Sequence, residues 1–295
     1  MRPSIWTQGA ALFGCEDIDA ALPALVELGW DCFELSTEHL QALEDCDDRE
    51  ARIGRLRERL GALNAAMPQA HAYLSANVAH PDQEKRAADV QRLRKNFHTC
   101  AALGVEVAVV HPGRAEGYTT RDEYRQILAI NRRQFTDLGD LAGQLGLRIA
   151  IENLADAANV TGHRKFGSMP HELLDLLDEL DHPAVGICLD TSHMNQQGLD
   201  PAGMIADLAP HLLTTHVSDN DGTADQHRIP GDGNIDWPAV MAALAEAGYE
   251  GLINLEIGGA GGSAAQLVRL KIRHARQVAQ WLVELAGGDP GAAGP

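Results

Sequence analysis

Short apolar runs alternate with longer segments of helical periodicity along almost the whole chain. Apolar runs such as Val107–Val110 and Val185–Leu189 are typical of strands buried on both faces, as in a parallel sheet. The predicted strands are Ser4–Thr7, Asp31–Ser36, Leu63–Ala70, Val105–Val110, Arg148–Ile151, Val185–Leu189, Leu212–His216 and Leu252–Glu256. Between them, apolar residues three or four positions apart indicate helices. The clearest predicted helices are Asp17–Leu28, Glu84–Leu103, Arg121–Leu145, Met169–Leu180 and Ala265–Leu285.

This alternation predicts an α/β fold, specifically a single-domain (β/α)8 TIM barrel. The chain has 295 residues, which suits a barrel of about 250 residues. Glycines end several helices just before a strand, at Gly29, Gly104, Gly146 and Gly248. Acidic or hydroxyl side chains are placed to cap helix starts, at Asp17, Ser168 and Asp236. A doubly wound sheet is the alternative, but it requires a glycine-rich phosphate loop after the first strand, which Thr7–Ala11 matches poorly.

The domain is expected to cover residues 1–286, and the Gly/Pro-rich residues 287–295 are expected to form a disordered tail. The five cysteines form no CxxC pair, which indicates reduced thiols and a cytoplasmic protein. No apolar stretch approaches the roughly 18 residues of a membrane span. The first residues, Met1–Ser4, lack the apolar core of a secretion signal. The net charge of −18 makes nucleic acid an unlikely partner, because binding phosphates requires a basic surface.

Four successive predicted strands in the second half of the chain close with an acidic or imidazole side chain. These residues are Glu152, Asp190, His216 and Glu256, 26 to 40 residues apart. The carboxyl ends of barrel strands converge on one face, where three carboxylates would repel one another unless a cation lay between them. The sequence therefore predicts a divalent metal site. Oxygen ligands with one imidazole suit Mn²⁺, Co²⁺ or Mg²⁺, and Zn²⁺ is also compatible.

Further polar residues are predicted on the same face, as substrate-binding residues or additional metal ligands. They are His71, His111, His193, Asp225 and His227. Trp6 and Phe13, near the end of the first strand, are candidates for stacking on a sugar. Arg114, together with the basic run 163–165, is a candidate for holding a substrate phosphate or carboxylate, although we interpret this run as a solvated loop. Glu34 is a candidate for orienting a ligand or a substrate hydroxyl.

Five segments of the chain carry a resemblance to a known superfamily. They read IENL, CLDTSHMNQQG, THVSDN, HRIPGDGNIDW and INLEI. With them the chain resembles the xylose-isomerase-like TIM-barrel superfamily, and DTSHMN and PGDGNIDW resemble its sugar phosphate isomerase/epimerase branch. In ketose epimerases of that branch, the residues matching Glu152, Asp190, His216 and Glu256 bind one divalent metal. The two matching glutamates also exchange the proton, and a histidine matching His193 contacts the substrate.

A second resemblance, to the three-zinc apurinic endonucleases, involves a larger set of residues. All nine of their metal ligands have a match here: His71, His111, Glu152, Asp190, His193, His216, Asp225, His227 and Glu256. This resemblance implies up to three Zn²⁺ ions and a phosphodiesterase that acts on abasic DNA.

The favoured expectation is a divalent-metal-dependent isomerase or epimerase of a small sugar or sugar derivative. A metal-stabilised enediolate would form when one glutamate removes a proton, and the other glutamate would return it. If a leaving group lay β to that proton, the same site would act as a lyase or dehydratase on a keto-sugar or cyclitol. A zinc-dependent endonuclease and a non-enzymatic metal-binding role are the remaining alternatives. The sequence leaves open whether the chain forms a homo-oligomer.

Overall fold

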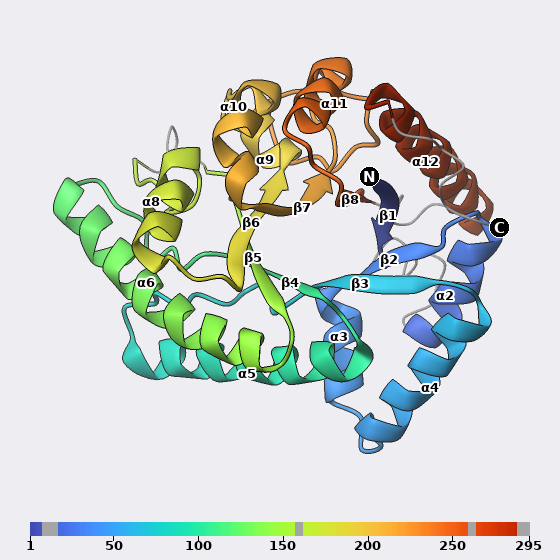
Figure 1. Ribbon diagram of the computed structural model, residues 1–295, viewed down its shortest axis with the longest axis horizontal. Coiled ribbons are helices and arrows are strands. Elements are labelled where there is room, and N and C mark those ends of the chain that lie inside the picture. The colour runs from blue at the N-terminus through green and yellow to red at the C-terminus, as the bar shows by residue number, and fades with distance from the viewer. Residues whose placement is uncertain (8–16, 157–161, 259–263, 288–295) are drawn as a thin grey trace.

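The computed structural model describes residues 1–7, 17–156, 162–258 and 264–287, which form a closed barrel of parallel strands (Figure 1). The strands follow one another around the barrel in chain order. They are β1 (Arg2–Trp6), β2 (Cys32–Leu35), β3 (Ala66–His71), β4 (Val107–Val110), β5 (Arg148–Glu152), β6 (Val185–Asp190), β7 (Leu212–Val217) and β8 (Leu252–Leu255). The barrel closes where β1 pairs with β8, with Ile5 opposite Leu255. The predicted TIM barrel is therefore confirmed.

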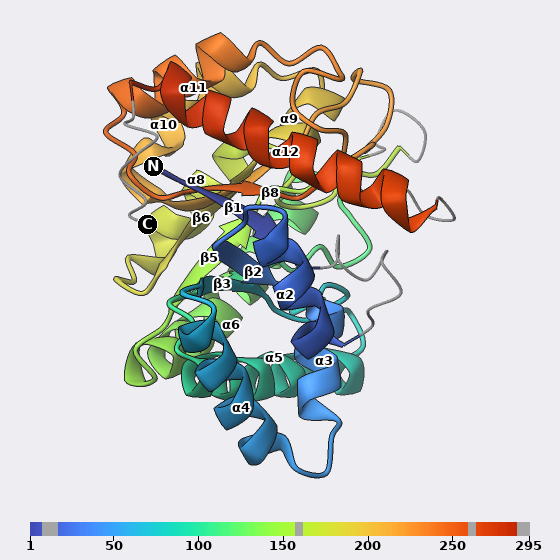
Figure 2. The same ribbon diagram turned by 90° about the vertical axis from the view of Figure 1, so that its right-hand side faces the viewer.

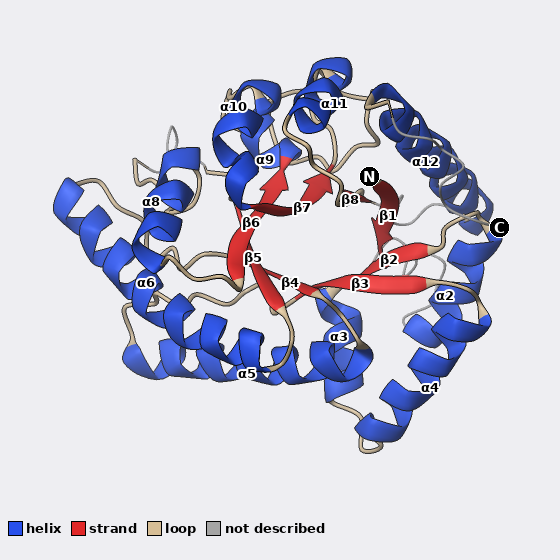
Figure 3. Cartoon of the chain, in the orientation of Figure 1, coloured by secondary structure: helices blue, strands red, loops and turns tan. Residues whose placement is uncertain are grey.

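Helices surround the barrel on the outside (Figure 3). Those in the described residues are α2 (Ile18–Glu27), α3 (Thr37–Glu44), α4 (Arg49–Ala62), α5 (Gln83–Leu103), α6 (Arg121–Gln144), α8 (Pro170–Leu180), α9 (Thr191–Gln196), α10 (Pro201–Leu208), α11 (Trp237–Glu246) and α12 (Ala265–Leu285), with a 3₁₀ turn at Ala209–His211. Figure 2 shows α12 crossing the outside of the barrel close to α2, where Arg276 donates a hydrogen bond to the carbonyl of Gly29. None of the described helices is long and apolar enough to span a bilayer.

Two apolar layers hold the fold together. The larger lies between the outer faces of the strands and the surrounding helices. A smaller cluster of Val107, Val109, Ala150 and Cys188 fills the barrel interior. Toward the carboxyl ends of the strands the interior becomes polar, because Glu34, His216 and Asn254 are all fully buried there. A packed apolar floor thus supports a buried polar layer, as expected at the catalytic face of a barrel.

Several element boundaries and one cap differ from the sequence predictions. The third strand begins at Ala66 rather than Leu63, because α4 continues to Ala62 and Asn64 turns the chain with a φ of 51°. The predicted caps Asp17 and Asp236 accept backbone hydrogen bonds at the starts of α2 and α11.

The predicted cap at Ser168 is wrong. Met169 is the N-cap of α8, where Glu172 reaches back to the amide of Met169 at 2.9 Å. The Ser168 hydroxyl instead donates to Asp156, at 3.2 Å. The predicted helix-ending glycines do adopt left-handed backbone, for example Gly104 with a φ of 84°. Of the predicted tail, Gly287 follows α12 in a turn and residues 288–295 lie outside the described residues, as does Phe13.

Candidate metal centre

Four side chains from consecutive strands meet at the carboxyl end of the barrel. Glu152 ends β5, Asp190 ends β6, His216 lies in β7, and Glu256 directly follows β8. The strand register places Asp190 beside His216. All four residues are buried, and each offers one ligand atom within 4.8 Å of the others. The structure therefore brings together the four residues that the sequence singled out as metal ligands.

Three atoms of this cluster are buried without a hydrogen-bond partner: Oδ2 of Asp190, Nδ1 of His216 and Oε2 of Glu256. Nδ1 of His216 lies 2.8 Å from Oε2 of Glu256 and 3.4 Å from Oε2 of Glu152, but makes no well-aligned hydrogen bond with either. A buried polar group left unsatisfied costs about 1–3 kcal/mol. A cation between these atoms would supply the missing interactions, so the donor set fits a divalent metal.

The orientation of His216 is fixed from behind by Glu34, which lies in β2. Nε2 of His216 lies 2.9 Å from Oε1 of Glu34, and Asn254 donates a hydrogen bond to Oε2 of Glu34. Burial disfavours the charged imidazole, but the surrounding acidic groups, Cys188 and Glu34 first, raise the pKa of His216 well above 6.5. Because Glu34 engages Nε2, Nδ1 faces the cluster as the available ligand atom.

Asp190 is held in place through both its side chain and its backbone. Its Oδ1 accepts a hydrogen bond from the amide of His193 at 2.7 Å and so caps α9. The side chain of Asn153 makes two hydrogen bonds with the backbone of Asp190. Its Oδ1 accepts one from the N–H of Asp190 at 2.7 Å, and its Nδ2 donates one to the carbonyl of Asp190 at 3.0 Å. Asn153 was not among the site residues predicted from the sequence, although its place directly after Glu152 in IENL was the available signal.

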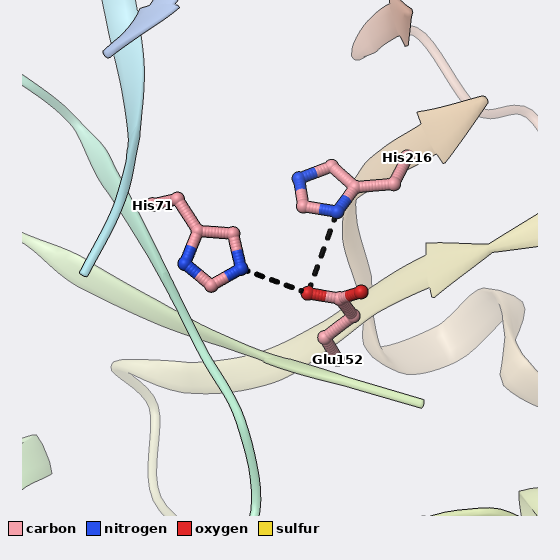
Figure 4. Close-up of side chains that lie close together, drawn as sticks. All are labelled: His71, Glu152 and His216. Carbon is pink, nitrogen blue, oxygen red and sulfur yellow. Dashed lines mark hydrogen bonds and ion pairs between the residues drawn. The ribbon is translucent and has the colours of Figure 1, made fainter. Parts of the chain in front are cut away.

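His71 and His111 contact the same oxygen of Glu152. Nε2 of His71 lies 3.2 Å from Oε2 of Glu152, and Nε2 of His111 lies 3.4 Å from it. Figure 4 shows this oxygen between His71 and His216. Nδ1 of His71 donates to the carbonyl of Ala72, which turns Nε2 toward the cluster. His71, Glu152 and His216 thus form a second group of converging ligand atoms.

Asp225 bridges the other two predicted histidines. Its Oδ2 lies 3.3 Å from Nε2 of His193 and 3.0 Å from Nε2 of His227. Burial alone would lower the pKa of His227, but the hydrogen bond that it donates to Asp225, together with the charges of Glu256, Asp225 and Asp190, raises the pKa to about 10. In turn, the two imidazoles hold the pKa of Asp225 below its usual value in spite of burial. Asp225, His227 and His193 therefore form one ionic cluster beside Glu256. The backbone carbonyl of Glu256 accepts a hydrogen bond from Nδ1 of His227.

The two predicted substrate contacts lie on either side of this face. Trp6 stacks on His227 with ring centroids 6.2 Å apart, and its indole donates to the carbonyl of Ile257. Arg114 lines a cavity of about 510 Å³ together with His111, His193 and Lys165. Of the basic run 163–165, Arg164 instead lies 3.6 Å from the buried carboxylate of Asp156.

Asp219 organises the loop that carries Asp225 and His227, and the analysis of the sequence did not single it out. Its carboxylate accepts hydrogen bonds from the amide of Gly231 at 2.8 Å and from the indole of Trp237 at 2.9 Å. Gly233 packs so closely against this loop that a Cβ there would lie 2.2 Å from the carbonyl of Asn220. The glycines of the PGDG segment were the available signal for such a close approach.

The family model described as "Xylose isomerase-like TIM barrel" matches residues 22–284 of the chain. An uncharacterized protein of Methanocaldococcus jannaschii is 30% identical over 183 residues, which cover 61% of this chain and 60% of that protein. A probable endonuclease 4 of Acholeplasma laidlawii is 26% identical over 197 residues, covering 61% and 63%. The chain thus spans less than two thirds of the length of these relatives.

Two solved structures share the fold over nearly the whole chain. A D-tagatose 3-epimerase-like protein superposes with a TM-score of 0.78 at 22% identity, covering 97% of this chain and 98% of that one. A D-psicose 3-epimerase crystallised in the presence of D-fructose gives a TM-score of 0.74 at 18% identity, covering 98% and 100%. At these identities the likeness shows the fold alone.

Proposed function

Because the chain belongs to the xylose isomerase-like TIM barrel family, we propose that it is a divalent-metal-dependent isomerase or epimerase of a small sugar or sugar derivative. The observation that carries the proposal is the convergence of Glu152, Asp190, His216 and Glu256, with three buried ligand atoms unpartnered. The D-tagatose 3-epimerase-like protein and the D-psicose 3-epimerase that share this fold support this choice of reaction class.

Glu152, Asp190, His216 and Glu256 would hold the ion, which we propose to be Mn²⁺, Co²⁺, Mg²⁺ or Zn²⁺. When bound, a divalent ion supplies Lewis-acid stabilisation of the negative charge that develops on a substrate oxygen. Glu34 positions His216 for this role through its contact with Nε2.

Glu152 and Glu256 are the proposed acid–base pair, because they reach the site from different strands, β5 and β8. One carboxylate would remove the proton next to the substrate carbonyl. The other would return a proton, to the opposite face in an epimerisation or to the neighbouring carbon in an isomerisation.

The neighbouring imidazoles favour the ionised form of both carboxyls. Burial raises the pKa of Glu152, but the charges of His216 and His111 outweigh it and hold the pKa well below 4.5. The same balance of burial and His216 lowers the pKa of Glu256. The neighbouring imidazoles therefore outweigh the effect of burial at both glutamates. Ionised carboxylates are ready to accept a proton, although a low pKa weakens them as bases.

A zinc-dependent endonuclease is the second candidate, favoured by one specific observation. His71 and His111 meet at Glu152, and His193 and His227 meet at Asp225, so all nine matching residues occupy one face. The net charge of −18 opposes binding to DNA. A lyase or dehydratase would use the same proton removal on a substrate that carries a leaving group, so the substrate decides between these reactions.

Deuterium exchange tests the proposal directly. The protein is stripped of metal, restored with Mn²⁺, Co²⁺, Mg²⁺ or Zn²⁺, and incubated in D₂O with a panel of ketoses. We expect metal-dependent incorporation of deuterium at the carbon next to the carbonyl, detected by NMR, with about one ion bound per chain. Three bound zinc ions, nicking of an abasic duplex and no exchange with any ketose would establish the endonuclease instead.

A further inference from the structure

A cavity of about 510 Å³ opens directly beside the candidate metal centre. Its inner wall includes His111 and His193, whose ring nitrogens lie 3.4 and 3.3 Å from the carboxylate of Glu152. Leu74 and Leu154 supply apolar wall. The volume suits a small ligand, and the contacts with Glu152 place the inner end of such a ligand next to the proposed acid–base pair.

Two cations, Arg114 and Lys165, line this cavity without a carboxylate partner in the part of the chain that the structure describes. The Arg114 guanidinium contacts only a carbonyl, that of Ala76 at 3.4 Å. The Lys165 ammonium likewise contacts the carbonyl of Ala155 at 3.1 Å. The chain has a net charge of −18, so acidic side chains are plentiful. Two cations in one cavity that pair with none of them therefore need an explanation.

The loops that carry these cations are joined to each other. Arg114 follows β4 and Lys165 follows β5. Tyr118 and Arg164 exchange two backbone hydrogen bonds, of 2.8 and 2.9 Å, which bridge the two loops. The backbone of Arg114 is fixed as well, because its amide donates to the side chain of Asn77 at 3.0 Å. Both cations therefore stand on a prearranged backbone.

The carboxylates in the cavity wall are already engaged by other groups. Asp225 lies between His193 and His227. Oδ2 of Asp156 lies 3.6 Å from Arg164 and accepts a hydrogen bond from Ser168, whereas Oδ1 of Asp156 is buried without a hydrogen-bond partner. These contacts leave the positive charges of Arg114 and Lys165 available to a ligand.

We propose that the substrate carries an anionic group, a phosphate ester or a carboxylate, which Arg114 and Lys165 bind. This inference rests on the proposed function, because it places the reacting carbons of the sugar toward Glu152 and Glu256. A guanidinium and an ammonium facing one cavity suit an oxyanion. Such a group accepts paired hydrogen bonds from arginine and is attracted by the compact positive charge of lysine. A neutral ketose would leave both cations without that partner.

Binding and exchange are measured separately, with D-fructose, D-fructose 6-phosphate and D-fructuronate as matched neutral, phosphate and carboxylate probes. Calorimetry on the metal-loaded protein gives affinities, and NMR in D₂O gives exchange rates. We expect at least one anionic probe to bind about tenfold to a hundredfold more tightly than D-fructose, with the difference shrinking as salt increases. The stronger of the two anionic probes identifies the source of the charge.

Arg114→Gln and Lys165→Gln should each remove about tenfold or more of this preference. Arg133→Gln and Lys85→Gln are matched controls on the exposed faces of α6 and α5, and should keep the preference. Equal affinity for all three probes, or a preference that survives both cavity variants, would overturn the anion site. Preferential binding without any exchange would leave the anion site standing and refute the proposed function. Exchange with D-fructose alone, with equal affinity for all three probes, would support the proposed function and refute the anion site.

Discussion

Glu34 in β2 and His216 in β7 meet inside the barrel, with Oε1 of Glu34 2.9 Å from Nε2 of His216, although their strands are not neighbours. An ionised carboxylate only accepts hydrogen bonds, so this contact requires Nε2 to carry a hydrogen. In the neutral form of the imidazole, which is the form that binds a metal, the lone pair then lies on Nδ1, which faces Glu256 at 2.8 Å. One buried carboxylate thereby selects the nitrogen that is available to a metal.

Glu34→Gln should weaken metal binding by about tenfold to a hundredfold, because the imidazole loses the group that fixes its tautomer and orientation. A competition titration against a chelating indicator measures this loss. Glu44→Gln is the matched control, since Glu44 is also buried but bonds Asn96 and Thr99 on the outside of the barrel. Equal metal affinity in the two variants would contradict the assigned role of Glu34.

Glu152→Gln and Glu256→Gln should each lower the deuterium exchange rate by about 10²–10⁴-fold, because each removes one partner of the proton transfer. Exchange is measured at a metal concentration that saturates each variant, so that weaker metal binding is not mistaken for lost chemistry. Glu106→Gln is the control, since Glu106 is exposed just before β4, at the opposite end of the barrel. Full exchange in either site variant would remove that glutamate from the mechanism.

Asp190→Asn should stabilise the metal-free protein near neutral pH. Burial raises the pKa of Asp190 from 3.8 to about 7; His193 opposes this, and Glu152 and Glu256 reinforce it. As pH rises, the carboxyl of Asp190 therefore loses its proton at a lower pH in the unfolded chain than in the folded protein. Because ionisation favours the unfolded chain, Asp190 destabilises the fold increasingly as pH rises from 3.8 to about 7. The asparagine cannot ionise and escapes this penalty.

Thermal unfolding in the presence of a chelator should show the Asp190→Asn midpoint exceeding that of the wild type by roughly 2–6 °C at about pH 8 and by less at about pH 5. Added Mn²⁺ should raise the midpoint of the wild type, because it binds only the folded state, and should have little effect on the variant. If the variant and the wild type had identical midpoints at both pH values, ionisation of Asp190 would not destabilise the fold.

Gly233→Ala should destabilise the protein by about 1–3 kcal/mol, because the new Cβ would overlap the carbonyl of Asn220 and the carboxylate of Asp219. Urea unfolding measures this change. Gly54→Ala provides a control of opposite sign, since nothing lies within 4 Å of a Cβ there and alanine favours a helix interior by about 0.5–1 kcal/mol. A tolerated alanine at position 233 would show that the loop is not tightly packed.

The fold was predictable because several strands of this barrel, such as β4 and β6, are short apolar runs between helical patterns. The four strand-end residues could be located from the strands in the second half of the chain. Hydrogen bonds made across the fold were not predictable. Asn153 holds the backbone of a different strand, and Asp219 gathers donors from a loop that follows it by 12 or more residues. The IENL and PGDG segments draw attention to these positions, but no local pattern records which distant residues they bond.

The basic run 163–165 shows the same limit at the scale of adjacent residues. From the sequence, Arg164 and Lys165 are equally good candidates for binding a substrate anion. In the structure, Arg164 pairs with Asp156, while Lys165 lines the cavity with Arg114. Only the path of the loop decides which cation faces the site, because neighbouring side chains in an irregular segment can point to different surroundings.

Closure of the barrel by β1 and β8 has a consequence for biosynthesis. The ribosome synthesises the chain from the N-terminus to the C-terminus. Glu152, Asp190 and His216 therefore leave the ribosome before Glu256, which follows the last strand. The fourth residue of the candidate metal centre can reach its place only after β8 has been made and has paired with β7 and β1. A nascent polypeptide therefore cannot bring all four side chains together until translation has passed that final strand, and any metal affinity that needs all four would arise only at the end of synthesis.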